Sequence, residues 1–296
     1  MPLLALGTFD LKPEEVAETI RHAVLDVGYR HIDTATVYGN EVQVGEGLQQ
    51  VFASGRVTRE EVFLVTKCWM SWFRNVREAC VRSLQRLQVP YLDLYLLHWP
   101  FALKPDPTDP DKFESGPQQF DDFPLYKAWE QMEALVDEGL VRHIGLSNWT
   151  VALTRDLLCY ARIKPVCNQF EAQPFHNQQK LIQFCQENSI VPVAYRAIYP
   201  PQINPLVTFK RGVMEEPLVL SLAEKYQKSP AQILINWCFR RRCGVIIKTR
   251  TPSRLVENWE AQDFELSAED TAALLALPQY GSYNEPEVLF AFPLFS

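Results

Sequence analysis

Short apolar runs rich in β-branched residues alternate along the chain with longer stretches that have the period of an amphipathic helix. The short runs predict strands, because β-branched and aromatic side chains suit an extended backbone. Eight strands are expected, at Leu3–Thr8, Tyr29–Asp33, Val62–Lys67, Leu92–His98, His143–Ser147, Val166–Glu171, Val191–Tyr195 and Val245–Lys248. Such regular alternation of strand and helix favours a parallel sheet with crossover helices.

Start signals precede several of the helical stretches. A first-turn proline or a capping side chain stands at Pro13, Asn40, Ser229, Thr251 and Ser267. Ser229 and Thr251 are each followed by proline at the first helical position. Ser267 has Asp270 three residues later, which predicts a capping box with aspartate in place of glutamate.

The parallel sheet can close in two ways, as an open doubly wound sheet or as a (β/α)8 barrel. A dinucleotide-binding open sheet needs a G-x-G-x-x-G turn after its first strand. The nearest match is Gly45-Glu-Gly47, which has Gln50 at the third glycine position and lies inside a helical pattern. The strand count and this missing turn favour a single-domain (β/α)8 TIM barrel over residues 1–296.

Three segments interrupt the alternation. Residues 101–124 and 196–211 are long, proline-containing stretches that follow strands, and are therefore expected as loops at the C-terminal face of the barrel. The tail, residues 278–296, has no helical period but contains several phenylalanines. This tail is expected either to strap the barrel or to fold over its mouth.

Composition narrows the class of protein. The chain has 296 residues, 47% of them hydrophobic and 22% charged, which is typical of a globular protein. The net charge of −7 disfavours nucleic acid or an anionic membrane as the main partner. We expect no membrane span and no signal peptide. Seven cysteines without a CxxC pair predict a reduced, cytoplasmic protein, and the five histidines lack metal-ligand spacing, so no metal is expected.

Four polar residues lie at or just after the ends of consecutive predicted strands. They are Asp33, Tyr38, Lys67 and His98. In a barrel these strand ends meet at one mouth. A lysine beside a tyrosine lowers the phenol pKa, an aspartate holds the lysine charged, and a histidine can orient a carbonyl oxygen. Each residue alone has a common structural role, but four together favour carbonyl reduction, in which an oxygen gains a proton as hydride arrives.

At these residues the chain resembles the aldo-keto reductases, especially the branch with aldose and aldehyde reductases. Residues 28–45 fit the first family signature and residues 132–149 fit the second, except that Trp149 replaces the usual Phe or Tyr. Residues 246–254 resemble the third. The resemblance covers the whole chain and implies a (β/α)8 barrel that binds NADPH without a Rossmann motif.

The resemblance also implies residue roles. Tyr38 would be the general acid, Lys67 its pKa modulator, Asp33 the partner of Lys67, and His98 the residue that orients the substrate. The implied cofactor-binding residues, besides Asp33, are Gly7, Thr8, Phe9, Ser147, Asn148, Gln169, Tyr195, Arg196, Lys248, Thr249, Arg250, Thr251, Arg254, Glu257 and Asn258. Lys248, Thr249 and Arg254 match the residues that bind the adenosine 2′-phosphate in the family. Two cations and a hydroxyl suit a dianionic phosphate.

The implied substrate wall comprises Phe9, Trp69, His98, Trp99, Phe290 and Phe292. The chain departs from the family pattern at its start, where Met1-Pro2 nearly begins the first strand. It departs again after Tyr195, where Arg196-Ala-Ile-Tyr199-Pro-Pro replaces Ser-Pro-Leu-Gly. That second change bears on how the pyrophosphate is held.

The expected protein is a monomeric, NADPH-dependent reductase of small aldehydes and ketones. Two alternatives stay open. One is a non-catalytic NADP(H)-binding regulatory protein on the same scaffold. The other is a dehydrogenase that oxidises a sugar or a hydroxysteroid physiologically.

Overall fold

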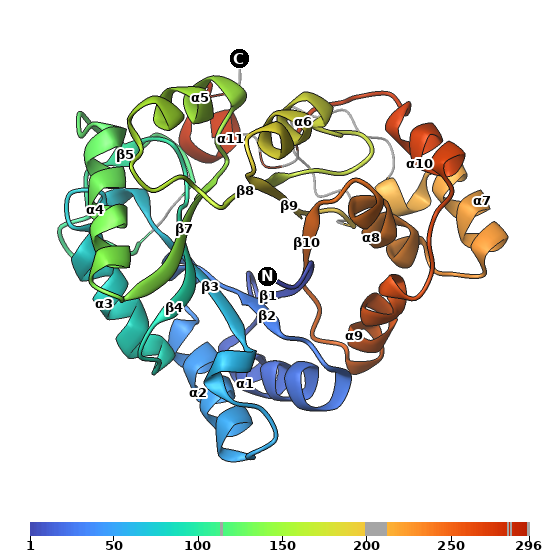
Figure 1. Cartoon of the computed structure of the whole chain (residues 1–296), viewed down its shortest axis with the longest axis horizontal. Helices are drawn as coiled ribbons and strands as arrows, with labels where there is room; N and C mark the ends of the chain where they lie inside the picture. The colour runs from blue at the N-terminus through green and yellow to red at the C-terminus, as the bar shows by residue number, and fades with distance from the viewer. Residues whose placement is uncertain (113–114, 199–211, 283, 285, 295–296) are drawn as a thin grey trace.

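The computed structural model describes residues 1–112, 115–198, 212–282, 284 and 286–294. Eight parallel strands close into a barrel in the order β1-β10-β9-β8-β7-β4-β3-β2, with β2 returning to β1. Figure 1 shows the helices arranged around the outside of this barrel. The barrel strands are β1 Leu4–Gly7, β2 His31–Asp33, β3 Phe63–Cys68, β4 Leu92–Leu97, β7 Val141–Ser147, β8 Cys167–Glu171, β9 Val191–Tyr195 and β10 Gly244–Ile247. All eight predicted strands and the barrel closure are confirmed.

The helices are α1 Pro13–His22, α2 Glu41–Ala53, α3 Val76–Leu87, α4 Leu125–Asp137, α5 Val151–Tyr160, α6 Gln179–Glu187, α7 Pro217–Tyr226, α8 Pro230–Arg240, α9 Pro252–Trp259, α10 Ala268–Leu275 and α11 Pro286–Phe290. Most of the helices surround the barrel, while α10 packs on α7 and α8. One π-helical turn, Ala23–Val27, extends α1, and short 3-10 turns occupy Thr36–Tyr38, Arg59–Glu61, Met70–Trp72, Val213–Glu215 and Glu260–Gln262. None of the helices in the described part of the chain has the length and apolar character that crossing a bilayer requires.

Gly45 shows why the glycine pair in α2 is not a nucleotide-binding turn. It lies inside the helix, and a Cβ there would collide with the carbonyl oxygen of Arg86 and lie 2.8 Å from the carbonyl carbon of Leu87. The glycine therefore lets α2 and α3 approach closely around the barrel.

Two capping predictions need correction. Asn40 precedes α2 but its side chain makes no capping bond; instead its amide donates to the carbonyl of Thr8 at 2.8 Å and ties the end of β1 to the start of α2. Thr251 precedes α9, also without a side-chain cap. Ser229 does form the capping box with Gln232 before α8.

The predicted box at Ser267 is only half formed. The Ser267 hydroxyl accepts from the backbone N–H of Asp270, as expected. The Asp270 carboxylate does not complete the box, because it accepts hydrogen bonds from Lys225 and Tyr226. The Tyr226 hydroxyl in turn accepts a hydrogen bond from the backbone N–H of Ser267. A neighbouring helix thus supplies the partners that a local box would have provided.

Two of the segments expected as irregular contain regular structure. Residues 101–124 include a two-stranded antiparallel pair, β5 Ala102–Leu103 with β6 Phe120–Asp121. The tail contains α11 and folds over the barrel mouth, where Phe290 is buried against Trp99 and Phe101. Of the third segment, residues 199–211 lie outside the described residues.

Candidate active site

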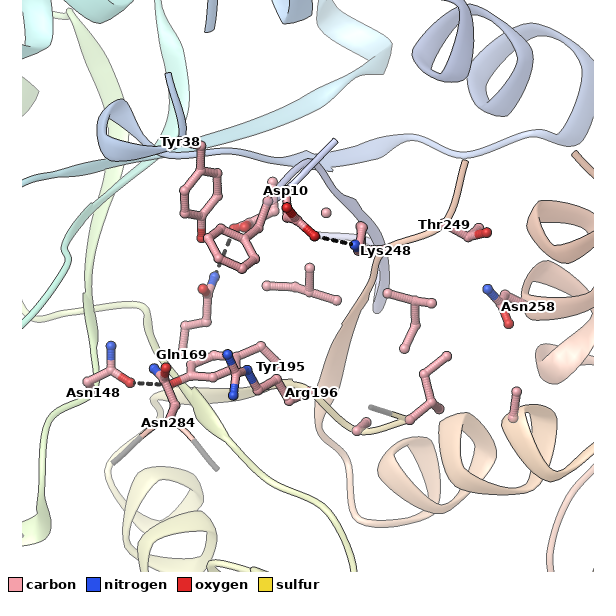
Figure 2. A pocket seen from close by; sticks show the side chains of 18 of the residues that line it. Asp10, Tyr38, Asn148, Gln169, Tyr195, Arg196, Lys248, Thr249, Asn258 and Asn284 are labelled. Atoms are coloured by element: carbon pink, nitrogen blue, oxygen red, sulfur yellow. Dashed lines mark hydrogen bonds and ion pairs between the residues drawn. The ribbon is translucent and has the colours of Figure 1, made fainter. Parts of the chain in front are cut away.

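A cavity of about 920 Å³ opens at the carboxyl ends of the barrel strands. Gly7, Asp33, His98, Asn148 and Tyr195 reach it from the ends of five different strands. Active sites of such barrels are built at this face, because loops of variable sequence follow the strands there. Figure 2 shows the side chains converging on this space.

Most of the predicted site residues line the cavity. They are Gly7, Phe9, Asp33, Tyr38, Trp69, His98, Trp99, Asn148, Gln169, Tyr195, Arg196, Lys248, Thr249, Arg254, Glu257, Asn258 and Phe290. The predicted residues that do not line it are Thr8, Lys67, Ser147, Arg250, Thr251 and Phe292.

Lys67 lies directly behind the cavity wall and joins two residues that do face the space. Its ammonium donates to Oδ1 of Asp33 at 2.6 Å, to the carbonyl of Thr34 at 2.8 Å and to the hydroxyl of Tyr38 at 3.3 Å. Lys67 and Asp33 are both buried. These three side chains come from β2, β3 and the 3-10 turn after β2, so the register of β2 with β3 brings them together.

The protonation states of Lys67 and Tyr38 depend on their burial and on the charges next to them. Burial by itself would lower the pKa of Lys67, but attraction to Asp33 and to Tyr38 outweighs burial and raises the pKa. Burial raises the pKa of the Tyr38 hydroxyl, although the ammonium of Lys67 acts in the opposite direction. The expected effect of the lysine is therefore present but smaller than the effect of burial. Tyr38 is a protonated phenol at neutral pH.

His98 stands across the cavity from Tyr38, with ring centroids 6.0 Å apart. Burial, together with the charge of Lys67, lowers the pKa of His98 well below its usual value. The imidazole is thus neutral and carries one N–H. The rings of Trp69 and Phe9 extend the wall, since Trp69 lies 5.1 Å from His98 and Phe9 lies 5.1 Å from Tyr38, centroid to centroid.

A connected set of amides and hydroxyls forms the deeper wall. Gln169 donates its amide to Oδ2 of Asp33 at 2.8 Å. Asn148, in a left-handed backbone conformation, donates to the carbonyl of His98 at 2.9 Å and accepts from the hydroxyl of Tyr195 at 2.6 Å. These bonds hold amide groups and an aromatic ring in fixed positions beside Tyr38. Trp149, the unusual signature residue, is buried and does not line the cavity.

The other end of the cavity is formed by β10 and α9. Lys248 and Thr249 follow β10 directly, and Arg254, Glu257 and Asn258 lie on α9 (Figure 2 labels three of them). Arg250, which the resemblance assigned to the cofactor, instead forms an ion pair with Glu15 at 3.1 Å. The Thr251 backbone N–H donates to the hydroxyl of Thr249.

Several lining residues were missed by sequence reasoning. They include Asp10, Val37, Ala197, Ile198, Met214, Ser229, Pro230, Ala231, Ile246, Ile247, Asn284 and Leu289. For Asn284 no sequence signal exists, because its amide reaches the Tyr195 hydroxyl only when the tail is folded back. Ser229 had been noticed for its cap, and Asp10 stands next to the predicted Phe9. Among the described residues no group of His, Cys, Asp and Glu is placed to hold a metal ion.

Known proteins match this chain over nearly its whole length. The sequence profile described as "Aldo/keto reductase family" matches residues 3–277. The NADP-dependent D-sorbitol-6-phosphate dehydrogenase of Malus domestica is 39% identical over 94% of this chain and 90% of its own. Aldo-keto reductase family 1 member A1 of Homo sapiens is 38% identical over 97% and 89%. The solved aldose reductase of Giardia lamblia superposes with a TM-score of 0.90 at 33% identity, over 100% of this chain and 98% of that one.

The barrel fold and the family match together define an oxidoreductase of the (β/α)8 barrel class. The chain belongs to the aldo/keto reductase family, and its relatives include a D-sorbitol-6-phosphate dehydrogenase and an aldose reductase.

Proposed function

We propose that this protein reduces aldehydes and ketones to alcohols with NADPH, and that Tyr38 is the general acid. The observation that carries the proposal is the buried Asp33–Lys67–Tyr38 chain, which ends in a phenol hydroxyl at the cavity surface. A neutral phenol supported by a fixed ammonium can give up a proton and remain stabilised as a phenolate.

The residues divide the work of carbonyl reduction. A bound NADPH would supply the hydride. The Tyr38 hydroxyl donates its proton to the carbonyl oxygen, and the ammonium of Lys67, at 3.3 Å, stabilises the phenolate left behind. The neutral ring of His98 donates a hydrogen bond that orients the same oxygen. The apolar rings of Trp69, Trp99 and Phe290 line the space beside them, exclude water and favour an apolar or aromatic substrate.

The cavity suits a nicotinamide dinucleotide with a 2′-phosphate. At one end, Asn148 and Gln169 present amides and Tyr195 presents an aromatic ring, which match a carboxamide and a flat heterocycle. At the other end, Lys248, Thr249 and Arg254 present two cations and a hydroxyl near the start of α9, which suit a phosphate dianion. Glu257 and Asn258 would face the adenine.

The test follows NADPH consumption with an aromatic aldehyde. Tyr38→Phe removes only the hydroxyl, so the turnover rate is expected to fall by about a hundredfold or more while NADPH still binds. Tyr126→Phe is the matched control, because Tyr126 is an exposed tyrosine paired with Tyr160 on the outer helices. Full activity of Tyr38→Phe would overturn the assignment of the acid, and NADPH binding without any turnover by the wild type would favour the non-catalytic alternative.

Oxidation of a sugar alcohol is the second candidate, supported by the name of the sorbitol-6-phosphate dehydrogenase relative. The same residues serve in reverse, since a Tyr38 phenolate held by Lys67 can accept the alcohol proton. Rates in both directions with one aldehyde–alcohol pair would establish the preference. We further propose that the protein acts as a monomer in the cytoplasm, in keeping with its seven free thiols.

A further inference from the structure

A carboxylate lies among the cations at the proposed adenosine-phosphate end of the cavity. Asp10 lines the cavity, and its Oδ2 lies 3.2 Å from the ammonium of Lys248. Figure 2 shows this ion pair beside Thr249 and Asn258. Lys248, directly after β10, and Arg254, on α9, both line the cavity there. An anionic group of a ligand in this position would therefore meet a cation that already has an anionic partner.

The fold places Asp10 at this point. It occupies a turn in which the Leu11 N–H donates to the Thr8 carbonyl at 3.2 Å, and its backbone is left-handed with φ of 58°. Aspartate tolerates this conformation better than most residues with a side chain. The neighbouring Leu11 is buried and anchors the turn. Strand β1 pairs with β10 through Leu6 and Ile247, so the turn after β1 meets Lys248 directly after β10.

The ion pair is accessible enough to be exchanged. The Asp10 side chain is 69% exposed and that of Lys248 is 32% exposed, so water and salt screen their attraction. A 2′-phosphate dianion carries more charge than a carboxylate and can displace it. The carboxylate then remains close to the phosphate and repels it. Both effects weaken the binding of a cofactor that carries the 2′-phosphate. A cofactor without the 2′-phosphate binds almost as it would without Asp10.

We propose that Asp10 is a specificity-determining residue that lowers the preference of this protein for NADP(H) over NAD(H) by competing with the 2′-phosphate for Lys248. The inference rests on the proposed function, because it assumes a dinucleotide in this cavity. It assigns to Asp10 the opposite role to that of Lys248, Thr249 and Arg254 in the same site.

The experiment measures dissociation constants of NADP+ and NAD+ at low ionic strength, by quenching of tryptophan fluorescence. Asp10→Asn keeps the size of the side chain and removes its charge. We expect NADP+ to bind about two- to five-fold more tightly to this variant, with NAD+ unchanged within twofold. The gain should shrink as salt is added, because the interaction is exposed.

Glu15→Gln is the matched control. It makes the same change in net charge, and Glu15 also faces a cation after β10, at 3.1 Å from Arg250, which does not line the cavity. We expect its ratio of NADP+ to NAD+ affinity to equal that of the wild type. A second check repeats Asp10→Asn in the Lys248→Met variant. Because the cation for which Asp10 competes is then absent, the substitution should change the ratio of NADP+ to NAD+ affinity by no more than half as much as in the wild type.

Three results would overturn the inference. Asp10→Asn could leave the NADP+ affinity unchanged, it could weaken it because the carboxylate orients Lys248 for the phosphate, or Glu15→Gln could shift the ratio equally. Measuring aldehyde reduction by the wild type distinguishes failure of the Asp10 proposal from failure of the proposed function. If the wild type reduces aldehydes with NADPH and the ratio does not move, the role of Asp10 alone is wrong. If the wild type neither binds NADP+ nor reduces an aldehyde, both proposals are wrong.

Discussion

Lys67 and Asp33 form an ion pair inside the barrel wall, 2.6 Å apart, with side chains that are 0% and 3% exposed. Asp33 also accepts from Gln169, and Lys67 also donates to Thr34 and Tyr38. The two charges are therefore both neutralised and hydrogen-bonded, which burial of an ion pair requires. The pair links the fold to the chemistry, since the same ammonium that neutralises Asp33 reaches the phenol.

Removal of one partner should be costly. Lys67→Met leaves Asp33 as a buried charge without its cation, and we expect a loss of about 3–5 kcal/mol in the free energy of unfolding. Asp33→Asn should destabilise the protein for the converse reason. The double variant should lose clearly less than the sum of the two, because neither charge then remains unpaired. Urea unfolding measures all three, and additive losses would show that the pair is not coupled.

The raised pKa of Tyr38 predicts the pH dependence of the reaction. Reduction needs the protonated phenol, so its rate is lost as pH rises through the pKa of Tyr38, which lies above the usual value of about 10. We expect the rate of reduction to be level across neutral pH and to decline only in the alkaline range. Oxidation, which needs the phenolate, should rise with pH. Initial rates in both directions test this, and a decline in reduction between about pH 6 and 8 would contradict it.

His176 should make the protein sensitive to acid. It is half-buried and forms an isolated bridge with Gln173 after β8, and its partial burial lowers its pKa from 6.5 to about 4. The unfolded chain then binds a proton that the folded one does not, so stability is lost as pH falls below about 6.5. One such histidine contributes a loss of about 2 kcal/mol by pH 5. Buried His31 and His98, with lowered pKa values, act in the same direction.

Unfolding free energies of His176→Gln at pH 7.5 and pH 5 measure this contribution. The variant should show a smaller difference between the two pH values than the wild type, whatever its stability at neutral pH. His143→Gln, on an exposed position of β7, controls for loss of a histidine. An unchanged difference in His176→Gln would contradict the prediction.

Phe290 is expected to shape the substrate site. Its ring is buried, 5.0 Å from Trp99 and 5.1 Å from Phe101 between centroids, and it lines the cavity. Phe290→Ala removes this wall, so KM for an aromatic aldehyde should rise about tenfold, while kcat for a small aliphatic aldehyde changes little.

Phe292→Ala supplies the comparison, because Phe292 packs on Phe101 and Phe120 but does not line the cavity. Its effect on KM should be smaller. Equal effects of the two variants would show that general ordering of the tail, and not the wall at Phe290, sets the affinity for substrate.

The elements with a strong local signal were predicted from the sequence, and those set by distant partners were not. Eight apolar runs of regular spacing identify the barrel strands, because each buried strand must carry such a run wherever it is placed. The pair β5–β6 has only two residues in each strand and no period to detect. Asn40 was predicted as a cap, but Thr8, thirty-two positions earlier, takes its amide.

The candidate site divides in the same way. The sequence by itself determined that Asp33, Tyr38, Lys67 and His98 stand at or just after strand ends, since residue type and strand pattern are local properties. Only the tertiary structure decided that Asp10 meets Lys248, that Asn284 meets Tyr195, and that Arg250 turns to Glu15. These contacts join residues up to 238 positions apart. They exist because closing the barrel puts β1 beside β10 and because the tail folds back over the mouth. Neither arrangement has a pattern of neighbouring residues from which it could be predicted.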